Sequence, residues 1–288
     1  MNYALFFLLC VIGGTTYAAQ KIGLAEGLPL WSAGMRFLIA GGIMWMFSLY
    51  KRRFVWNKET VFSGIQYGIL YFAIPFGIVY WLGQFLTSSL LSVLSSSVSV
   101  FAVIFNALFR NEKTTRRQLW GISLSMAGVG IVFLDSVFSY HAGMTGYLFI
   151  GIAAYCGAAY STAFLKHKIN GIDQNSFNLV ALMTGGVVLT ITSFLVEKGS
   201  RTFSGYGLYA LLYLSLMGSV FSTKITTFLM GQWNVAKVTA YRFISPVISI
   251  GVGFLLWREK LSCNEMIGCV FIIVGVFVIN RKAKQILQ

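Results

Sequence analysis

Hydrophobic residues fall in long runs that recur along the whole chain. Each run has about 17 to 25 residues, enough for a helix to cross a hydrocarbon layer of about 30 Å. The short alternating strands of a membrane β-barrel are absent from the sequence. Because a helix satisfies its own backbone groups, the pattern predicts an all-α integral membrane protein. We expect ten transmembrane helices, at 3–22, 30–50, 61–83, 86–109, 117–135, 144–165, 175–196, 207–231, 237–257 and 264–280.

Composition and charge agree with this interpretation. Of the 288 residues, 57% are hydrophobic and 10% are charged, whereas a soluble domain has about 25% charged residues. The net charge of +14 would suggest a nucleic-acid partner in a soluble protein, but the basic residues cluster between apolar runs. We therefore expect a lipid bilayer and a small-molecule substrate as partners, no nucleic acid, and a monomer or weak dimer.

The distribution of Lys and Arg predicts the orientation of the chain. Residues 1–20 contain no basic residue, so the first run reads as a retained helix and not as a secretory signal. With a cytoplasmic N-terminus, the inner connections carry 14 Lys and Arg residues and the outer connections carry 5. The positive-inside rule then places both termini in the cytoplasm of a bacterial inner membrane.

Two halves of the chain resemble each other at a shift of about 147 residues. Glu112–Lys113 aligns with Glu259–Lys260, Gly121 with Gly268, and Gly128 with Gly275. Near the front, Gly14 and Tyr17 align with Gly157 and Tyr160 at a shift of 143. Each half has five helices, and an odd number forces opposite orientations. We therefore expect two inverted repeats, 1–139 and 140–288, an organisation typical of transporters.

Several segments together resemble the EamA branch of the drug/metabolite transporter superfamily. They are Gly13–Gly14 through Lys21, Leu28–Pro29 with Arg36–Phe37, Asn111–Glu112–Lys113 followed by Gly121, and Pro246 thirteen residues before Glu259. One departure is Ser99, where the family has a proline. The resemblance implies alternating-access transport, often export, with a central cavity from the first, third, fourth, sixth, eighth and ninth helices. It also implies that there is no cofactor and no catalytic residue.

Two basic residues within predicted helices are candidates for binding a substrate. Lys224 and Arg242 lie at similar depth in consecutive helices, and a charge inside a membrane is expensive. They either hold a substrate carboxylate or phosphate, or extend to the cytoplasmic interface. No Asp or Glu lies in a helix interior, which disfavours a proton-driven exporter of cations.

A stripe of serines is the second candidate. Ser88, Ser92, Ser95 and Ser99 share one helix face, and Ser95 aligns with Arg242 in the other half. These serines either line a polar cavity or allow close helix packing.

Further candidates are aromatic and amide side chains. Four tyrosines are candidates for lining the substrate path, although most membrane aromatics face lipid or the interface: Tyr17, Tyr80, Tyr160 and Tyr241. The candidates for a structural or gating role are Arg36, Gln84, Gln232 and Pro246.

These observations predict a transporter, most simply an exporter, of amino acids or other carboxylate-bearing metabolites. The alternative within transport is an exporter of neutral or cationic amphipathic drugs. An enzyme or a membrane scaffold is disfavoured, because no connection exceeds about ten residues and no nucleophile or metal constellation is found. The four cysteines form no CxxC pair, so we expect reduced thiols and no metal site.

Overall fold

The computed structural model describes residues 1–25, 27–50, 57–86, 88–110, 114–139, 144–203, 205–257 and 263–280. The Glu112–Lys113 and Glu259–Lys260 pairs of the proposed repeat lie outside these residues. Within them the regular structure is helical. The first half contains α1 (Asn2–Leu24), α2 (Pro29–Tyr50), α3 (Lys58–Tyr67), the π-helical turn η1 (Gly68–Ala73), α4 (Ile74–Leu82), α5 (Ser88–Arg110) and α6 (Arg116–Ser139). The second half contains α7 (Met144–Lys168), α8 (Gln174–Val196), α9 (Gly205–Ser215), η2 (Leu216–Phe221), α10 (Ser222–Gln232), α11 (Val235–Thr239), α12 (Tyr241–Trp257) and α13 (Cys263–Asn280).

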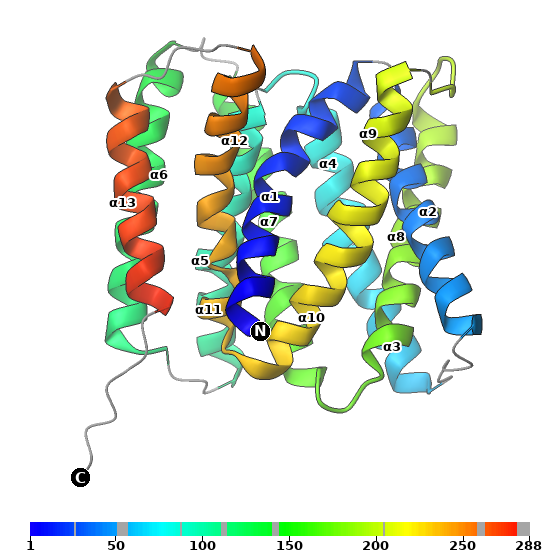
Figure 1. Cartoon of the computed structure of the whole chain (residues 1–288). Coiled ribbons are helices and arrows are strands. Elements are labelled where there is room, and N and C mark those ends of the chain that lie inside the picture. Colours follow the sequence, from blue (N-terminus) through cyan, green and yellow to red (C-terminus); the bar gives the residue numbers. More distant parts are fainter. Residues whose placement is uncertain are drawn as a thin grey trace.

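The helices lie side by side in one bundle (Figure 1). The most extensive helix contacts pair α6 with α13, α2 with α8, α1 with α12, and α5 with α7. Figure 1 shows α6 and α13 at one edge of the bundle, α2 and α8 toward the other, and α1 between them. The hydroxyl of Tyr3 donates to the carbonyl of Asn280 at 3.5 Å, so α1 begins at the end of the bundle where α13 finishes.

The outside of the bundle is apolar, as a lipid-facing surface must be. Trp120, Leu195 and Phe277 expose 76%, 81% and 64% of their surface, and many other large hydrophobic side chains are exposed as well. A soluble protein rarely exposes so much apolar surface. Seven stretches of the described residues are long and apolar enough to cross a membrane: Asn2–Leu24, Pro29–Tyr50, Lys58–Leu82, Leu90–Leu108, Gln174–Val196, Gly205–Gln232 and Val235–Val252. Met266–Asn280 is a shorter apolar helix, and α6 and α7 are outside this set.

Glycines bring α6 and α13 into backbone contact. A Cβ on Gly121 would lie 2.7 Å from the carbonyl oxygen of Gly275, and one on Gly128 would lie 2.7 Å from that of Gly268. Between these contacts, Ser125 donates to the carbonyl of Ile272 at 3.5 Å. Neither helix has room for a side chain at these positions, so their closeness depends on glycine.

A second close approach joins α2 and α8. A Cβ on Gly41 would meet the Met183 side chain at 2.5 Å, and one on Gly186 would meet Leu38 at 2.8 to 2.9 Å. At one end of this pair the Glu197 carboxylate accepts from the backbone N–H groups of Leu30 and Trp31, at 2.7 and 3.0 Å. The carboxylate thus satisfies two N–H groups that the first turn of α2 leaves without a helical partner.

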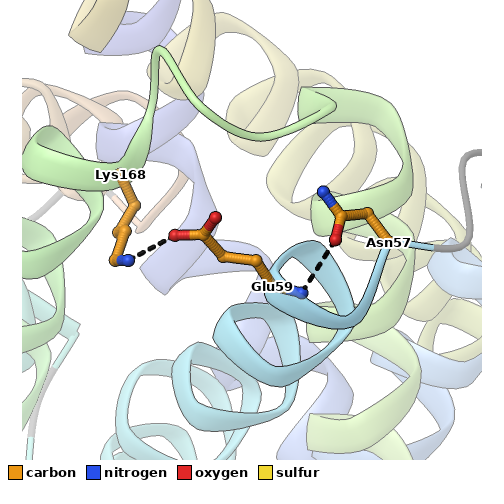
Figure 2. Close-up of polar contacts among 3 residues, drawn as sticks. All are labelled: Asn57, Glu59 and Lys168. Atoms are coloured by element: carbon orange, nitrogen blue, oxygen red, sulfur yellow. Dashed lines mark hydrogen bonds and ion pairs between the residues drawn. The ribbon is translucent and has the colours of Figure 1, made fainter.

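At the other end of the bundle an ion pair joins the two halves. Figure 2 shows Lys168, at the end of α7, against Glu59 in the first turn of α3. Asn57 caps the same turn, its side-chain oxygen accepting from the N–H of Glu59 at 3.1 Å. Both charged side chains are substantially exposed, so solvent screening limits what the pair adds to stability.

Replacing Gly128 with alanine tests the glycine contacts. The added methyl would meet the Gly268 carbonyl, Ile272 N and Phe271 Cβ, all within 2.8 Å, two of them backbone atoms that cannot rotate away. We expect Gly128→Ala to lower the free energy of unfolding by about 1–3 kcal/mol, measured by thermal unfolding in detergent micelles.

The matched control is Gly130→Ala on the same helix, because a Cβ at Gly130 has no atom within 4 Å. We expect this control to unfold at or above the wild-type temperature, since alanine favours helix over glycine. Equal unfolding temperatures for the two variants would contradict the close approach of α6 and α13.

Candidate functional site

A cavity of about 60 Å³ lies inside the bundle. Its walls come from α1, α2, α3, η1, α4, α5, η2, α10 and α12. The volume suffices for a few water molecules, so a metabolite can enter only if the surrounding helices move apart. The lining includes the first, third, fourth, eighth and ninth apolar runs, as the resemblance implied. It also includes the second run through Arg36, and no lining residue comes from the sixth.

Arg242 and tyrosines form one wall of this cavity. The Arg242 guanidinium donates from Nη2 to the Tyr71 hydroxyl and lies over the Tyr241 ring, 5.3 Å from its centroid. Tyr71 stacks on Tyr67 with ring centroids 4.5 Å apart. All four residues line the cavity. A neutral hydroxyl is the hydrogen-bond partner of this guanidinium, which leaves its positive charge available to an anion.

Two breaks in regular geometry position Arg242. The helix is interrupted at Ala240, so α12 begins at Tyr241, directly before the arginine. Pro246 lies four residues after Arg242 and is buried inside α12. Proline has no N–H, so the carbonyl of Arg242 lacks the usual helical donor at this position. Pro246, a structural candidate from the sequence, therefore shapes the turn that carries the cation.

Arg36 is the second cation on the cavity wall. Its surface is only 1% exposed. It donates from Nε to Ser219 Oγ at 2.8 Å, from Nη2 to the Gly218 carbonyl at 2.8 Å, and from Nη1 to the Tyr80 hydroxyl at 3.3 Å. The guanidinium also lies 5.2 Å from the ring centroid of Phe76. Arg36 therefore has the structural partners that the sequence led us to expect. All of these acceptors are neutral, and two of them, the Ser219 hydroxyl and the Gly218 carbonyl, lie in η2.

The serine stripe is divided between packing and the cavity. Ser95 lines the cavity, together with Arg242, the residue with which the 147-residue shift aligns it. Ser99 donates to the carbonyl of Thr239 at 2.8 Å and joins α5 to α11. Ser92 is buried and its carbonyl accepts from the Ser95 hydroxyl. Both interpretations of the stripe therefore apply, each to different serines.

The structure separates Lys224 from the cavity. Its ammonium lies over the Phe47 ring, 4.0 Å from the centroid, whereas its neighbours Thr223, Thr226 and Thr227 line the cavity. The two cations predicted as a pair, Lys224 and Arg242, do not share one wall. In geometry, Arg36 takes the place that the sequence assigned to Lys224.

The remaining candidates are spread over the molecule. Tyr17 lines the cavity, and its hydroxyl is 3.3 Å from that of Tyr155. Tyr80 is not among the lining residues, but its hydroxyl accepts from Arg36. Tyr160 packs against Phe105 away from the lining. Gln84 and Gln232 are exposed at helix ends, Gln84 donating to the carbonyl of Trp81.

Tyr67, Tyr71 and the three threonines of α10 were not expected from the sequence. Their helical spacing places them on shared faces, Tyr67 with Tyr71 four residues apart and Thr223 with Thr226 and Thr227 at three and four. A search for polar pairs at this spacing within apolar runs would have found them.

Carboxylates are absent from the cavity wall as the structure describes it. The acidic side chains that are described, Glu59, Asp173 and Glu197, all lie at helix ends. No group of three His, Cys, Asp or Glu residues fit to hold a metal ion occurs among the described residues. The cavity is therefore a cationic site lined by hydroxyl groups and aromatic rings, which suits an organic anion.

Replacing Tyr71 with phenylalanine tests the contact that orients Arg242. A hydrogen bond to a charged group contributes about 1.5–3 kcal/mol, so we expect Tyr71→Phe to lower the unfolding temperature measurably in detergent micelles. Tyr206→Phe is the control, because 78% of Tyr206 is exposed, and it should stay within about 0.5 kcal/mol of wild type. A wild-type unfolding temperature for Tyr71→Phe would show that the hydroxyl does not hold the guanidinium.

The chain is similar to known proteins over nearly its whole length. YedA, an uncharacterized inner membrane transporter of Escherichia coli K12, is 27% identical over 280 residues, which cover 96% of this chain and 90% of YedA. A probable amino-acid metabolite efflux pump of the same strain is 23% identical over 287 residues, covering 95% and 93%. A solved structure superposes with a TM-score of 0.76 at 14% identity, over 97% of each chain, which supports the fold.

The sequence model of the EamA-like transporter family matches residues 1–134 and 144–281. Its members are membrane transporters, and the apolar helices of this chain agree with that setting. The family and its transport role, expected from the sequence, are confirmed by this match, and the chain belongs to the EamA-like transporter family.

Proposed function

We propose that this protein moves small organic solutes that carry a carboxylate, amino acids among them, across the inner membrane by alternating access. Export is the simplest direction, because a relative is named a probable amino-acid metabolite efflux pump. The observation that carries the proposal is the Arg242 guanidinium on a cavity wall whose acceptors are neutral. Placing such a cation inside a membrane costs free energy, and a bound anion offsets that cost.

We further propose ten membrane spans in two inverted repeats, 1–139 and 140–288. The glycine contacts support this, since Gly121 meets Gly275 while Gly268 meets Gly128, and these pairs exchange under the 147-residue shift. A two-fold axis produces such contacts in pairs: each contact between two residues is repeated between their equivalents in the other half. The Ser125 hydroxyl donates to the carbonyl of Ile272. Ile272 is 147 residues away, so it is the residue that the shift aligns with Ser125.

The π-helical turns support the same relation. η1 begins at Gly68 and η2 at Leu216, 148 residues apart, each within a long helical stretch. π-turns are rare and occur mostly at functional sites, so a matched pair by chance is improbable. Both turns contribute to the cavity wall, through Tyr71 and Gly218. An axis relating the halves would then pass near the cavity, as in other inverted-repeat transporters.

Counterflow in proteoliposomes tests the transport role. With a mixed pool of labelled amino acids and carboxylates, we expect uptake of anionic members by the wild type. Arg242→Gln should reduce that uptake at least about tenfold, because a charge-assisted hydrogen bond contributes about 1.5–3 kcal/mol. Uptake of neutral or cationic amphipathic drugs instead would favour the drug-exporter alternative, and unchanged uptake by Arg242→Gln would refute the site.

Lys224→Gln belongs in the same assay. A paired-cation site predicts the same loss as for Arg242→Gln, whereas the position of Lys224 over Phe47, away from the cavity lining, predicts a change of less than about threefold. The two outcomes decide whether Lys224 contributes to binding.

Cysteine labelling tests the orientation and the number of spans. In a variant whose four natural cysteines are replaced by alanine, Ser200→Cys lies between α8 and α9, and Gly171→Cys lies between α7 and α8. With ten spans and cytoplasmic termini, a membrane-impermeant maleimide should label position 200 in intact cells. Position 171 should be labelled only after permeabilisation. The reverse pattern would invert the proposed topology.

A further inference from the structure

The cavity wall carries two guanidinium groups, from Arg36 on α2 and Arg242 on α12. A guanidinium has five N–H donors. Within the described part of the chain, Arg36 donates three hydrogen bonds and Arg242 donates one. Most donors of Arg242 therefore remain available to a ligand in the cavity.

The surroundings do not neutralise these two charges. Their acceptors are the hydroxyls of Ser219, Tyr80 and Tyr71 and the carbonyl of Gly218, all uncharged. Among the described residues that line the cavity there is no carboxylate. Arg36 is buried and Arg242 is half-buried. A charge without a counter-ion is costly in such surroundings, so the site is best compensated by two negative charges. A monoanion would leave one guanidinium without a counter-charge.

An ammonium group has no favourable place in the same cavity. Without a carboxylate to accept it, an ammonium would depend on the faces of aromatic rings. Three of the lining rings already carry an arginine, because Arg242 lies over Tyr71 and Tyr241, and Arg36 lies over Phe76. An added ammonium would meet like charge at these three rings and near both guanidinium groups, so a zwitterionic amino acid gains less here than the corresponding acid without the amine.

Arg36 can accept a ligand by exchanging neutral partners for an anion. Its Nη2 reaches the Gly218 carbonyl at 2.8 Å because Gly218 has no side chain, and a Cβ there would lie 2.8 Å from the same nitrogen. An anionic oxygen is a stronger acceptor for a guanidinium than a carbonyl or hydroxyl. Opening of the cavity and entry of an anion would thus favour movement of Arg36 from η2 toward the ligand.

We infer that the preferred substrate is a compact dianion without an ammonium group, either a dicarboxylate or a phosphate monoester, with Arg242 and Arg36 both contacting its anionic oxygens. The inference rests on the proposed transport function. It narrows the substrate class to dianions without an ammonium group and extends it to phosphate monoesters. It assigns Arg36, beyond its structural bonds, the role of selecting two negative charges over one.

Binding to the purified full chain in nanodiscs tests this, with thermal stabilisation at graded ligand concentrations as the readout. Succinate, butyrate and aspartate form a matched set, because butyrate lacks one carboxylate of succinate and aspartate adds an ammonium. We expect succinate or glycerol 3-phosphate to bind at least about tenfold more tightly than butyrate or aspartate. The better of these two dianions identifies the carboxylate or the phosphate class.

Variants separate the role of Arg36 from a general loss of binding. Arg36→Gln should remove the advantage of succinate over butyrate while leaving butyrate affinity within about threefold. If Arg36→Gln does not fold, Gly218→Ala displaces the guanidinium with its charge intact and should reduce the same preference. Lys21→Gln, an exposed cation at the end of α1, is the charge-loss control and should bind as wild type.

The inference is overturned if butyrate or aspartate binds as tightly as both dianions, if no ligand stabilises the protein, or if Arg36→Gln weakens all ligands equally. Counterflow with the same ligands separates it from the transport proposal. Dianion binding without counterflow would sustain the site and refute transport. Equal counterflow of aspartate and succinate would sustain transport and refute the dianion preference.

Discussion

The structure depends on how the buried guanidinium of Arg36 is satisfied, because none of the partners that the structure describes for it is an acid. Arg36 is 1% exposed, and its donors are met by a hydroxyl and a carbonyl at the π-turn η2 and by Tyr80. This requires α2 to lie against η2, and it requires glycine at position 218. The close packing of α2 on α8 and the Glu197 cap at the start of α2 hold the helix that presents the arginine. The cavity is lined by Arg36, by Gly218 of η2 and by Arg242 of α12.

The π-turns explain how polar groups are brought to one place inside an apolar bundle. An extra residue in a helical turn shifts the side chains that follow around the axis, and it leaves backbone groups able to bond side chains. In η2, Ser219 donates to the carbonyl of Leu214, five residues earlier, while accepting from Arg36. In η1, Tyr71 faces the cavity and accepts from Arg242. Each turn thus supplies a hydrogen-bond acceptor to one of the two arginines.

Sequence reasoning worked where the controlling interactions are local or repeated. The hydrophobic runs fall on the observed helices because burial in lipid is read directly from composition, and the aligned glycines Gly121 and Gly128 prove to be contact points. Ser95 and Arg242 were expected to face one space, and both line the cavity. The proposed alignment of the halves predicted this placement.

Sequence reasoning failed where the direction of a side chain around its helix decided the outcome. Lys224 follows Thr223 by one residue, which turns it about 100° away, and only the packed neighbours decide which of the two faces the cavity. The sequence predicted a structural role for Arg36, but it contained no sign that η2 would supply the partners. The π-turns have no sequence signature of their own. The four-residue spacing of Tyr67 and Tyr71 is visible in the sequence, but it does not show that Tyr71 would face Arg242.

The two arginines also bear on what the protein must exclude. A cavity that contains water inside a membrane is a route by which hydronium and sodium ions could dissipate the gradients that the cell maintains. Two fixed positive charges at that point raise the electrostatic energy of any small cation that enters, in the way that a single arginine helps aquaporin-type pores to exclude protons. A cavity large enough for a few water molecules can therefore lie inside the membrane without becoming a route for cations.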